Sequence, residues 1–283
     1  MRVFLVLLDG EIQVIRRVFS GKVFSVVAGL LLLFAPLVAQ AQADRIGIVL
    51  MHGKHGLPTG LVAALAQGLE KQGYLVANLE MPWSRNRTYD VPVARAEEEV
   101  RAAIADLRGK GARKLFLAGH SLGGAFATYL AGRLAVDGTI AIAPGGDVSN
   151  RVYRIHVDES LSRARRLVEE GKGAERVELI DYEGGAPYAI HAVPAAYVTW
   201  FDPAGALNMN RSTRAANPRS PVLWIVPTND YPGLLKLSLA LYRGLPAHPL
   251  TRLYEPEADH RGAPTASIDQ IVRWTKGVAA AAE

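Results

Sequence analysis

The sequence predicts an α/β protein whose central sheet is mostly parallel and is flanked by helices. Three features support this prediction. Short apolar runs recur along the chain, segments with the spacing of amphipathic helices separate them, and glycine or proline residues stand at most of the boundaries. Strands that alternate with helices of about 10–15 residues form parallel sheets that are covered on both faces. We therefore expect one α/β domain over residues 44–283.

The first half of the expected sheet has three strands. Residues 46–52 form a short apolar run that ends in a glycine-rich turn. Residues 61–69 follow with apolar side chains at i, i+3 and i+4 spacing, which predicts a helix. A second strand is expected at 74–79, and the helix expected at 93–108 carries three glutamates near its start, where the helix dipole favours negative charge. The third strand is expected at 114–119.

The second half of the chain continues the alternation. The remaining expected elements are helix 122–136, strand 139–143, strand 221–227, helix 234–245, strand 251–255 and helix 268–280. Because helices again separate most of these strands, we expect them to extend the same parallel sheet.

An inserted cap is expected at residues 144–220, where the alternation stops. A structureless loop of this length is uncommon inside a compact domain. The segment contains a basic helical pattern at 161–170, whose arginines are expected to face solvent, and a run rich in aromatic residues. These aromatic side chains either form a small core of the insertion or wall a substrate pocket: Tyr188, His191, Tyr197, Trp200 and Phe201.

Residues 1–43 are predicted to be a signal peptide. A charge-free apolar run at 23–43 follows several basic residues, and Ala41 and Ala43 form an A-x-A cleavage site before Asp44. An uncleaved anchor is the alternative, but it needs about 20 apolar residues, whereas this run contains a proline and ends in glutamine and alanine. We therefore expect a periplasmic or secreted protein that is cleaved near Ala43 and has no stable membrane anchor.

Composition excludes several classes of function. The chain has 283 residues and no cysteine, which excludes disulfides, thiolate zinc sites, iron–sulfur clusters and a cysteine nucleophile. The formal net charge of +5 arises from charges of both signs spread along the chain, so nucleic-acid binding is not expected. His52 and His55 are only weak evidence for a metal site, because no carboxylate stands near them in the sequence. We expect neither a metal nor a cofactor.

The strongest motif is GHSLGG at residues 119–124, between the third strand and the following helix. A nucleophile on such a turn has a strained backbone, the glycines allow close approach of neighbouring backbone, and the helix N-terminus places amide dipoles beside developing negative charge. The motif in this context resembles the nucleophile elbow of the α/β-hydrolase superfamily. The resemblance extends over essentially the whole of residues 44–283. It implies the α/β-hydrolase fold, with Ser121 as the nucleophile.

The resemblance also implies a catalytic acid and a histidine, in the chain order serine, acid, histidine. Asp230 stands just past the fifth expected strand, and His260 stands just past the last one. We therefore expect a triad of Ser121, Asp230 and His260. Asp147, which follows the fourth strand, is the alternative acid, whereas Asp259 is adjacent to the histidine in sequence and is expected to point elsewhere.

Two backbone amides are expected to bind the oxyanion. One is the amide of Leu122, the residue after the nucleophile. The resemblance implies that the other belongs to Lys54, because the family's H-G-x turn reads His52-Gly53-Lys54 in this chain. We expect the Lys54 side chain either to line the mouth of the pocket or to be solvated. Loss of one such donor typically removes about 2.7–4 kcal/mol of transition-state stabilisation.

Together these residues predict a serine hydrolase that cleaves carboxylic esters through an acyl-enzyme intermediate. The expected substrate is a small-molecule ester or amide. A peptidase or amidase with the same triad is an alternative, in which Glu183 could hold a peptide terminus. A non-catalytic envelope binding protein is a third alternative, although a fold alone has no need of a complete triad.

Overall fold

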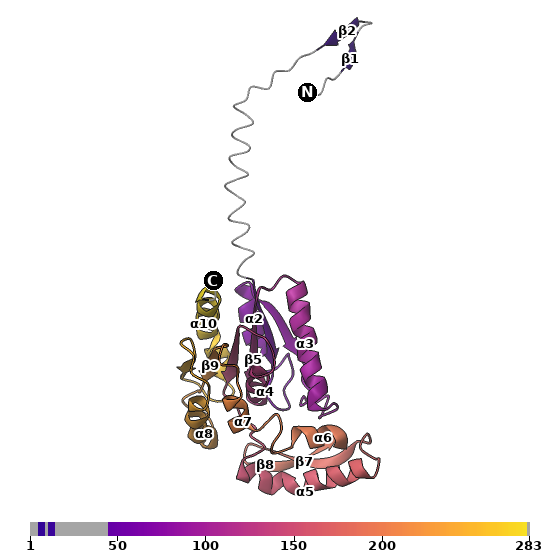
Figure 1. The fold of residues 1–283 in the computed structure, drawn as a ribbon, viewed down its shortest axis with the longest axis vertical. Coiled ribbons are helices and arrows are strands. Elements are labelled where there is room, and N and C mark those ends of the chain that lie inside the picture. Colours follow the sequence, from indigo (N-terminus) through magenta and orange to yellow (C-terminus); the bar gives the residue numbers. More distant parts are fainter. Residues whose placement is uncertain (1–4, 9–10, 15–44, 282–283) are drawn as a thin grey trace. The chain divides into compact units, whose positions relative to one another are not determined.

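The computed structural model describes residues 5–8, 11–14 and 45–281. The chain divides into two compact units, Met1–Ala43 and Asp44–Glu283 (Figure 1). All the site residues expected from the sequence belong to the second unit.

The first unit contains a short hairpin. Strand β1 (Leu5–Leu8) pairs antiparallel with strand β2 (Glu11–Val14). The apolar run at 23–43 and the cleavage site predicted before Asp44 lie outside the described residues. Within the residues that the structure describes, no helix is both long enough and apolar enough to cross a membrane.

The second unit is built on a six-stranded sheet in which every neighbouring pair of strands is parallel. Its strands are β3 (Ile46–Met51), β4 (Leu75–Leu79), β5 (Lys114–His120), β6 (Gly138–Ile142), β9 (Val222–Ile225) and β10 (Arg252–Tyr254). The strand order is β10-β9-β6-β5-β3-β4. The predicted parallel sheet is confirmed, and β5, which precedes the expected nucleophile, lies inside the sheet rather than at an edge.

Strand β3 shows how the sequence specifies this sheet. Its residues, IGIVLM, are all buried. Because successive side chains of a strand point to opposite faces, Ile48 and Leu50 join one apolar cluster, whereas Val49 and Met51 join the other. Both faces of the strand are therefore covered, as is usual in parallel sheets.

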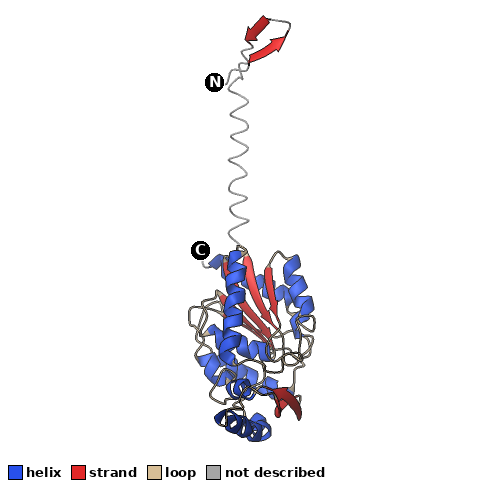
Figure 2. Ribbon diagram, turned by 90° about the vertical axis from the view of Figure 1, so that its right-hand side faces the viewer, coloured by secondary structure: helices blue, strands red, loops and turns tan. Residues whose placement is uncertain are grey.

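Helices lie on both sides of the strands (Figure 2). One apolar cluster contains side chains of α2 and α10, and the other contains side chains of α3, α4 and α8. The helices outside the insertion are α2 (Ala63–Lys71), α3 (Val93–Gly109), α4 (Leu122–Ala131), α8 (Pro232–Arg243), α9 (Ala263–Ala266) and α10 (Ile268–Ala281).

Two helix boundaries differ from the sequence expectation. Helix α4 ends at Ala131 rather than at Val136, because the carbonyl of Ala131 accepts a hydrogen bond from the amide of Asn217 (3.1 Å). This is a tertiary contact that local periodicity does not reveal. Helix α8 begins at Pro232, two residues before the expected start. Proline suits the first position of a helix, because the backbone N–H that it lacks would have no acceptor within the helix there.

Residues 144–220 contain regular structure of their own. The elements are α5 (Arg151–Glu169), β7 (Val177–Glu183), β8 (Ala186–Ala192), α6 (Pro194–Trp200) and α7 (Met209–Arg214). Strands β7 and β8 form an antiparallel hairpin. Figure 1 shows α5, this hairpin and α6 together beyond the carboxyl ends of the sheet strands.

The aromatic residues of this segment are mostly core. Tyr197, Trp200 and Phe201 are fully or almost fully buried, and the rings of Tyr197 and Phe201 stack with centroids 3.8 Å apart. Trp200 meets Trp83 edge-on at 5.4 Å. The insertion thus shares one apolar core with the α3 and α4 side of the sheet, and of the two alternatives expected for the aromatic run, these three residues follow the core alternative.

Candidate active site

Ser121 occupies the turn between β5 and α4. Its backbone lies at φ 55° and ψ −117°, in a region that side-chain-bearing residues rarely adopt. A Cβ on Gly119 would overlap the backbone of Gly123, and a Cβ on Gly123 would lie 2.7 Å from the carbonyl oxygen of His52. The turn therefore requires both glycines, as the GHSLGG motif predicts.

His260 and Asp230 meet beside this turn. The Nδ1 atom of His260 lies 2.8 Å from Oδ1 of Asp230, and the Asp230 side chain is 1% exposed. The loops that carry them follow β10 and β9, and a bridge between Asn229 and Asp259 holds these loops side by side. The amide of Tyr231 donates a second hydrogen bond to the same carboxylate oxygen (2.6 Å).

The two other candidate acids are engaged elsewhere. Asp147 accepts hydrogen bonds from the amide (3.0 Å) and the hydroxyl (2.6 Å) of Ser149, which is a local turn after β6. Asp259 accepts from the amide of Gly262 (2.7 Å). Of the three carboxylates considered, Asp230 is the one that contacts the histidine.

Ser121, His260, Leu122 and Lys54 line a single cavity of about 600 Å³. The amide of Leu122 has no acceptor within its helix, because Leu122 is the first residue of α4. The turn before Lys54 lies against the serine, since a Cβ on Gly53 would be 3.1 Å from the Cβ of Ser121. The cavity therefore brings the expected nucleophile, base and both oxyanion donors together.

The sequence profile of the alpha/beta hydrolase family matches residues 48–274. The chain belongs to this family. The match includes the turn that carries Ser121 and the loops that carry Asp230 and His260. No curated protein sequence matches the chain.

Several solved structures share the fold of this hydrolase. One is a metagenome-derived lipolytic enzyme, 19% identical, with a TM-score of 0.58 over 83% of this chain and 94% of the other. A second is the monoacylglycerol lipase of Paleococcus ferrophilus, 19% identical, with a TM-score of 0.60 over 82% of this chain and 94% of the other. A third is the esterase domain of a Rhodothermus marinus protein, 18% identical, with a TM-score of 0.52 over 82% and 87%. At these identities the likeness establishes the fold.

The side chain of Lys54 is not solvated, although Lys54 lines the cavity. Its Nζ lies 2.6 Å from Oδ1 of Asp181, a fully buried residue of β7, and the Lys54 side chain is 4% exposed. Burial alone would raise the pKa of the Asp181 carboxyl, but the Lys54 charge and hydrogen bonds from Lys54 and Tyr153 lower that pKa below its ordinary value. The pair is therefore ionic. Sequence reasoning missed Asp181, whose one signal is a carboxylate within a β-rich run.

Two histidines near the site are structural. The Nε2–H of His120 donates to the carbonyl of His260 (2.8 Å), and the two rings lie 4.9 Å apart. Burial, followed by the nearby charge of His260, lowers the pKa of His120 to about 4, so this ring is neutral at pH 7. His52 accepts from the amide of Met81 at Nε2 (3.0 Å) and donates from Nδ1 to the carbonyl of Gly53 (2.7 Å), which leaves it no free nitrogen for a metal.

The cavity has an apolar wall and a polar rim. Leu234, Leu237 and Leu241 of α8 supply the wall, together with Met209. The polar rim includes Glu183 at the turn of the β7–β8 hairpin. The sequence did not assign α8 to the site, because its periodicity is that of any helix with one buried face.

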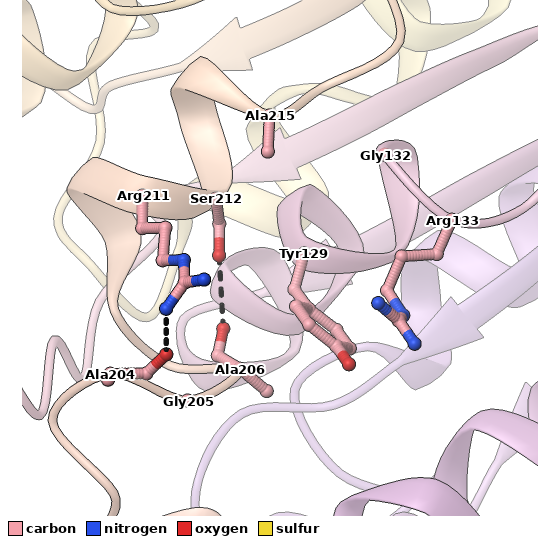
Figure 3. Close-up of a pocket in the computed structure, with 9 residues that line it drawn as sticks. All are labelled: Tyr129, Gly132, Arg133, Ala204, Gly205, Ala206, Arg211, Ser212 and Ala215. Atoms are coloured by element: carbon pink, nitrogen blue, oxygen red, sulfur yellow. Dashed lines mark hydrogen bonds between the residues drawn. The ribbon is translucent and has the colours of Figure 1, made fainter.

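A second cavity, of about 360 Å³, lies beside the end of α4 (Figure 3). None of the triad residues lines it. Arg211 donates to the carbonyl of Ala204 (2.9 Å), and Arg133 is paired with Glu97 (2.8 Å). Both guanidinium groups are therefore already paired within the protein. This second cavity is separate from the one that Ser121 lines.

Proposed function

We propose that this hydrolase cleaves carboxylic esters that have an apolar acyl group, through an acyl-enzyme formed on Ser121. The observation that carries the proposal is the 2.8 Å pair of His260 and Asp230 at the cavity that the strained serine also lines. A positive-φ serine beside a histidine–carboxylate pair and a helix N-terminus is the arrangement that acyl transfer requires.

The proposed reaction has two halves. Ser121 Oγ attacks the ester carbonyl carbon while Nε2 of His260 takes the hydroxyl proton, and Asp230 stabilises the imidazolium through Nδ1–H. Collapse of the tetrahedral intermediate expels the alkoxide, which receives that proton from His260. Water then attacks the acyl-enzyme by the same steps, releasing the carboxylic acid and the free serine.

The amides of Leu122 and Lys54 would stabilise the negative oxygen of each tetrahedral intermediate. They are fixed in the fold before substrate binds, so they need little reorganisation when charge develops. Removal of one such donor typically lowers kcat about 10²–10³-fold.

The leucine wall of α8 favours an apolar acyl chain. Leu234 and Leu237 lie about one helical turn apart, and Leu241 lies one turn further along the same side. An acyl chain along this wall would remove apolar surface from water, at about 0.8 kcal/mol per buried methylene. Two solved structures with this fold are a monoacylglycerol lipase and an esterase domain, and such a substrate agrees with both.

The test uses 4-nitrophenyl esters of two to twelve acyl carbons (roughly the span of a 600 Å³ cavity) and a fluorophosphonate probe. Wild type should hydrolyse the esters and be labelled by the probe. Ser121→Ala should lose both properties while keeping its thermal unfolding midpoint. Ser267→Ala, a buried serine whose hydroxyl donates to the carbonyl of Ala263 outside the cavity, is the matched control and should keep both. More than a few per cent residual activity in Ser121→Ala would refute the acyl-enzyme mechanism.

Glu183 gives a specific reason to include amides in the same assay. It lines the cavity at the hairpin turn, and its carboxylate lies 3.6 Å from Nδ1 of His55. A carboxylate in this position could hold the amino terminus of a peptide. Faster turnover of aminoacyl amides than of esters, abolished in Glu183→Gln, would identify a peptidase instead.

We further propose that the protein is exported and cleaved before Asp44. The charge-free run at 23–43 and its A-x-A site support this proposal. N-terminal sequencing of the protein from the envelope fraction should give a chain that begins at Asp44. An intact leader in membrane fractions would instead identify this segment as an uncleaved membrane anchor.

A further inference from the structure

A buried ion pair links the oxyanion turn to the inserted segment. Lys54 and Asp181 are 127 positions apart in the sequence, and their side chains are 4% and 0% exposed. Besides the carboxylate, Lys54 Nζ donates to the hydroxyl of Tyr153 (2.8 Å) and to the carbonyl of Tyr182 (3.1 Å). These three acceptors use all three ammonium protons, so the Lys54 side chain has one position.

The carboxylate of Asp181 is held just as firmly. Its Oδ1 accepts from the hydroxyl of Tyr153 (2.5 Å) and from the amide of Tyr182 (2.7 Å). Its Oδ2 accepts from the hydroxyls of Tyr89 (3.0 Å) and Tyr188 (2.8 Å). Because these donors come from the 82–92 loop, α5 and the hairpin, three segments fix the anion to which Lys54 is tied.

The backbone on the other side of the Lys54 amide is also fixed. The carbonyl of Gly53 accepts from His52 Nδ1–H (2.7 Å) and from the amide of Gly56 (3.0 Å). The peptide between Gly53 and Lys54 is planar and trans, so its N–H points away from that carbonyl. The Gly53 oxygen thus holds one edge of the peptide plane, and the anchored Lys54 side chain holds the α-carbon at its other end.

Folding alone does not require this pair of charges. Removing two ions from water is so unfavourable that apolar residues of similar size often give equal or greater stability. The ammonium group of Lys54 donates to three protein acceptors, which leaves it no proton for a substrate. What the pair does provide is a defined position for one backbone amide.

We propose that Asp181 is a positioning residue for ester hydrolysis, which fixes the Lys54 amide in the oxyanion hole by holding the Lys54 side chain. The inference rests on the proposed function, because it takes that amide to be an oxyanion donor. A displaced amide weakens binding of the transition state more than binding of the ester, so the effect belongs to kcat rather than to KM.

The first test is Asp181→Asn, which keeps the size of the side chain but removes its charge. We expect kcat to fall about 10–100-fold while KM stays within about threefold, since the donor is displaced rather than deleted. A trifluoromethyl ketone, whose adduct with Ser121 carries an oxyanion, should lose affinity by the same factor as kcat.

The second test separates positioning from stability. Lys54→Met/Asp181→Asn keeps the Lys54 amide but leaves no unpaired buried charge, so its unfolding midpoint should return toward that of wild type. Its kcat and inhibitor affinity should stay low, because the side-chain anchor is gone. Recovery of kcat together with stability would overturn the proposal. This double variant decides the question even if Asp181→Asn does not fold.

A matched control breaks a different ion pair. Glu97 contacts Arg101 (2.6 Å) and Arg133 (2.8 Å) outside the cavity, so Glu97→Gln should change the unfolding midpoint but leave kcat within about twofold. An inactive wild type or an active Ser121→Ala would refute the proposed function itself. An active wild type, with unchanged kcat and inhibitor affinity in Asp181→Asn, would refute the positioning role alone.

Discussion

Replacing Asp230 by asparagine removes the carboxylate that contacts His260 and keeps the shape of the side chain. Oδ1 of Asp230 accepts hydrogen bonds from Nδ1 of His260 (2.8 Å) and from the amide of Tyr231 (2.6 Å). Oδ2 is buried and has no hydrogen-bond partner among the described residues. An asparagine amide at the Oδ2 position would be a buried donor without an acceptor, and at the Oδ1 position it would face two donors.

The size of the effect follows from this geometry. In the tetrahedral intermediate His260 is an imidazolium, and its charge centre lies about 4 Å from that of Asp230, where two unit charges interact by about 4 kcal/mol at an effective dielectric constant of 20. Loss of that interaction corresponds to about a 10³-fold decrease in rate. The same substitution in the serine-protease triad lowers kcat about 10⁴-fold, partly through the wrong imidazole tautomer. We therefore expect Asp230→Asn to lower kcat about 10³–10⁴-fold.

The assay compares Asp230→Asn with Asp147→Asn. Both variants are measured with the best 4-nitrophenyl ester at pH 8, and their unfolding midpoints are recorded to confirm folding. Asp147→Asn should change kcat less than about threefold, because Asp147 contacts Ser149 rather than the histidine. A larger loss in Asp147→Asn, or more than a tenth of wild-type kcat in Asp230→Asn, would refute this assignment of the acid.

Three further predictions follow from burial and packing. In Gly123→Ala the new Cβ would overlap the carbonyl oxygen of Met51, so thermal denaturation should show a loss of about 1–3 kcal/mol, whereas Gly277→Ala, with open space around it, should show none. Leu237→Trp should fill the apolar wall and lower kcat/KM for an octanoate ester more than about tenfold relative to acetate, measured with 4-nitrophenyl esters. The pKa of His120 is about 4 in the folded protein and about 6.5 when unfolded, so between these values the unfolded chain binds more protons. The free energy of unfolding should therefore fall as pH drops from 6.5 to 4, by about 3 kcal/mol, and urea titrations should show a smaller fall in His120→Gln.

The sheet could be predicted from the sequence because its strands are buried on both faces. A run such as IGIVLM in β3 is apolar at every position, and that pattern is local. The prediction of Asp230 and His260 came from the resemblance to the hydrolase family, in which the acid and the histidine stand after late strands. Each follows a late strand, and the carboxyl ends of parallel strands meet at one edge of the sheet.

The Lys54–Asp181 pair could not be predicted in this way. It joins the turn after β3 to the hairpin of the insertion, and no periodicity links positions that far apart in the chain. The same limit applies to the aromatic run of the insertion. Whether Tyr197 and Phe201 face a core or a cavity depends on where α6 packs, and that is decided by Trp83 and Phe126, which lie far away in the sequence.

The backbone conformation of Ser121 bears on how a chain of this kind changes over generations. A non-glycine residue held at such angles opposes folding by about 1–3 kcal/mol, and glycine at the same position would be free of most of that strain. Folding therefore exerts no selection for a serine here and favours its loss. Under the proposed mechanism, selection on turnover would retain it. Descendants of this hydrolase that no longer needed to cleave a substrate would lose Ser121 early and would gain stability by doing so.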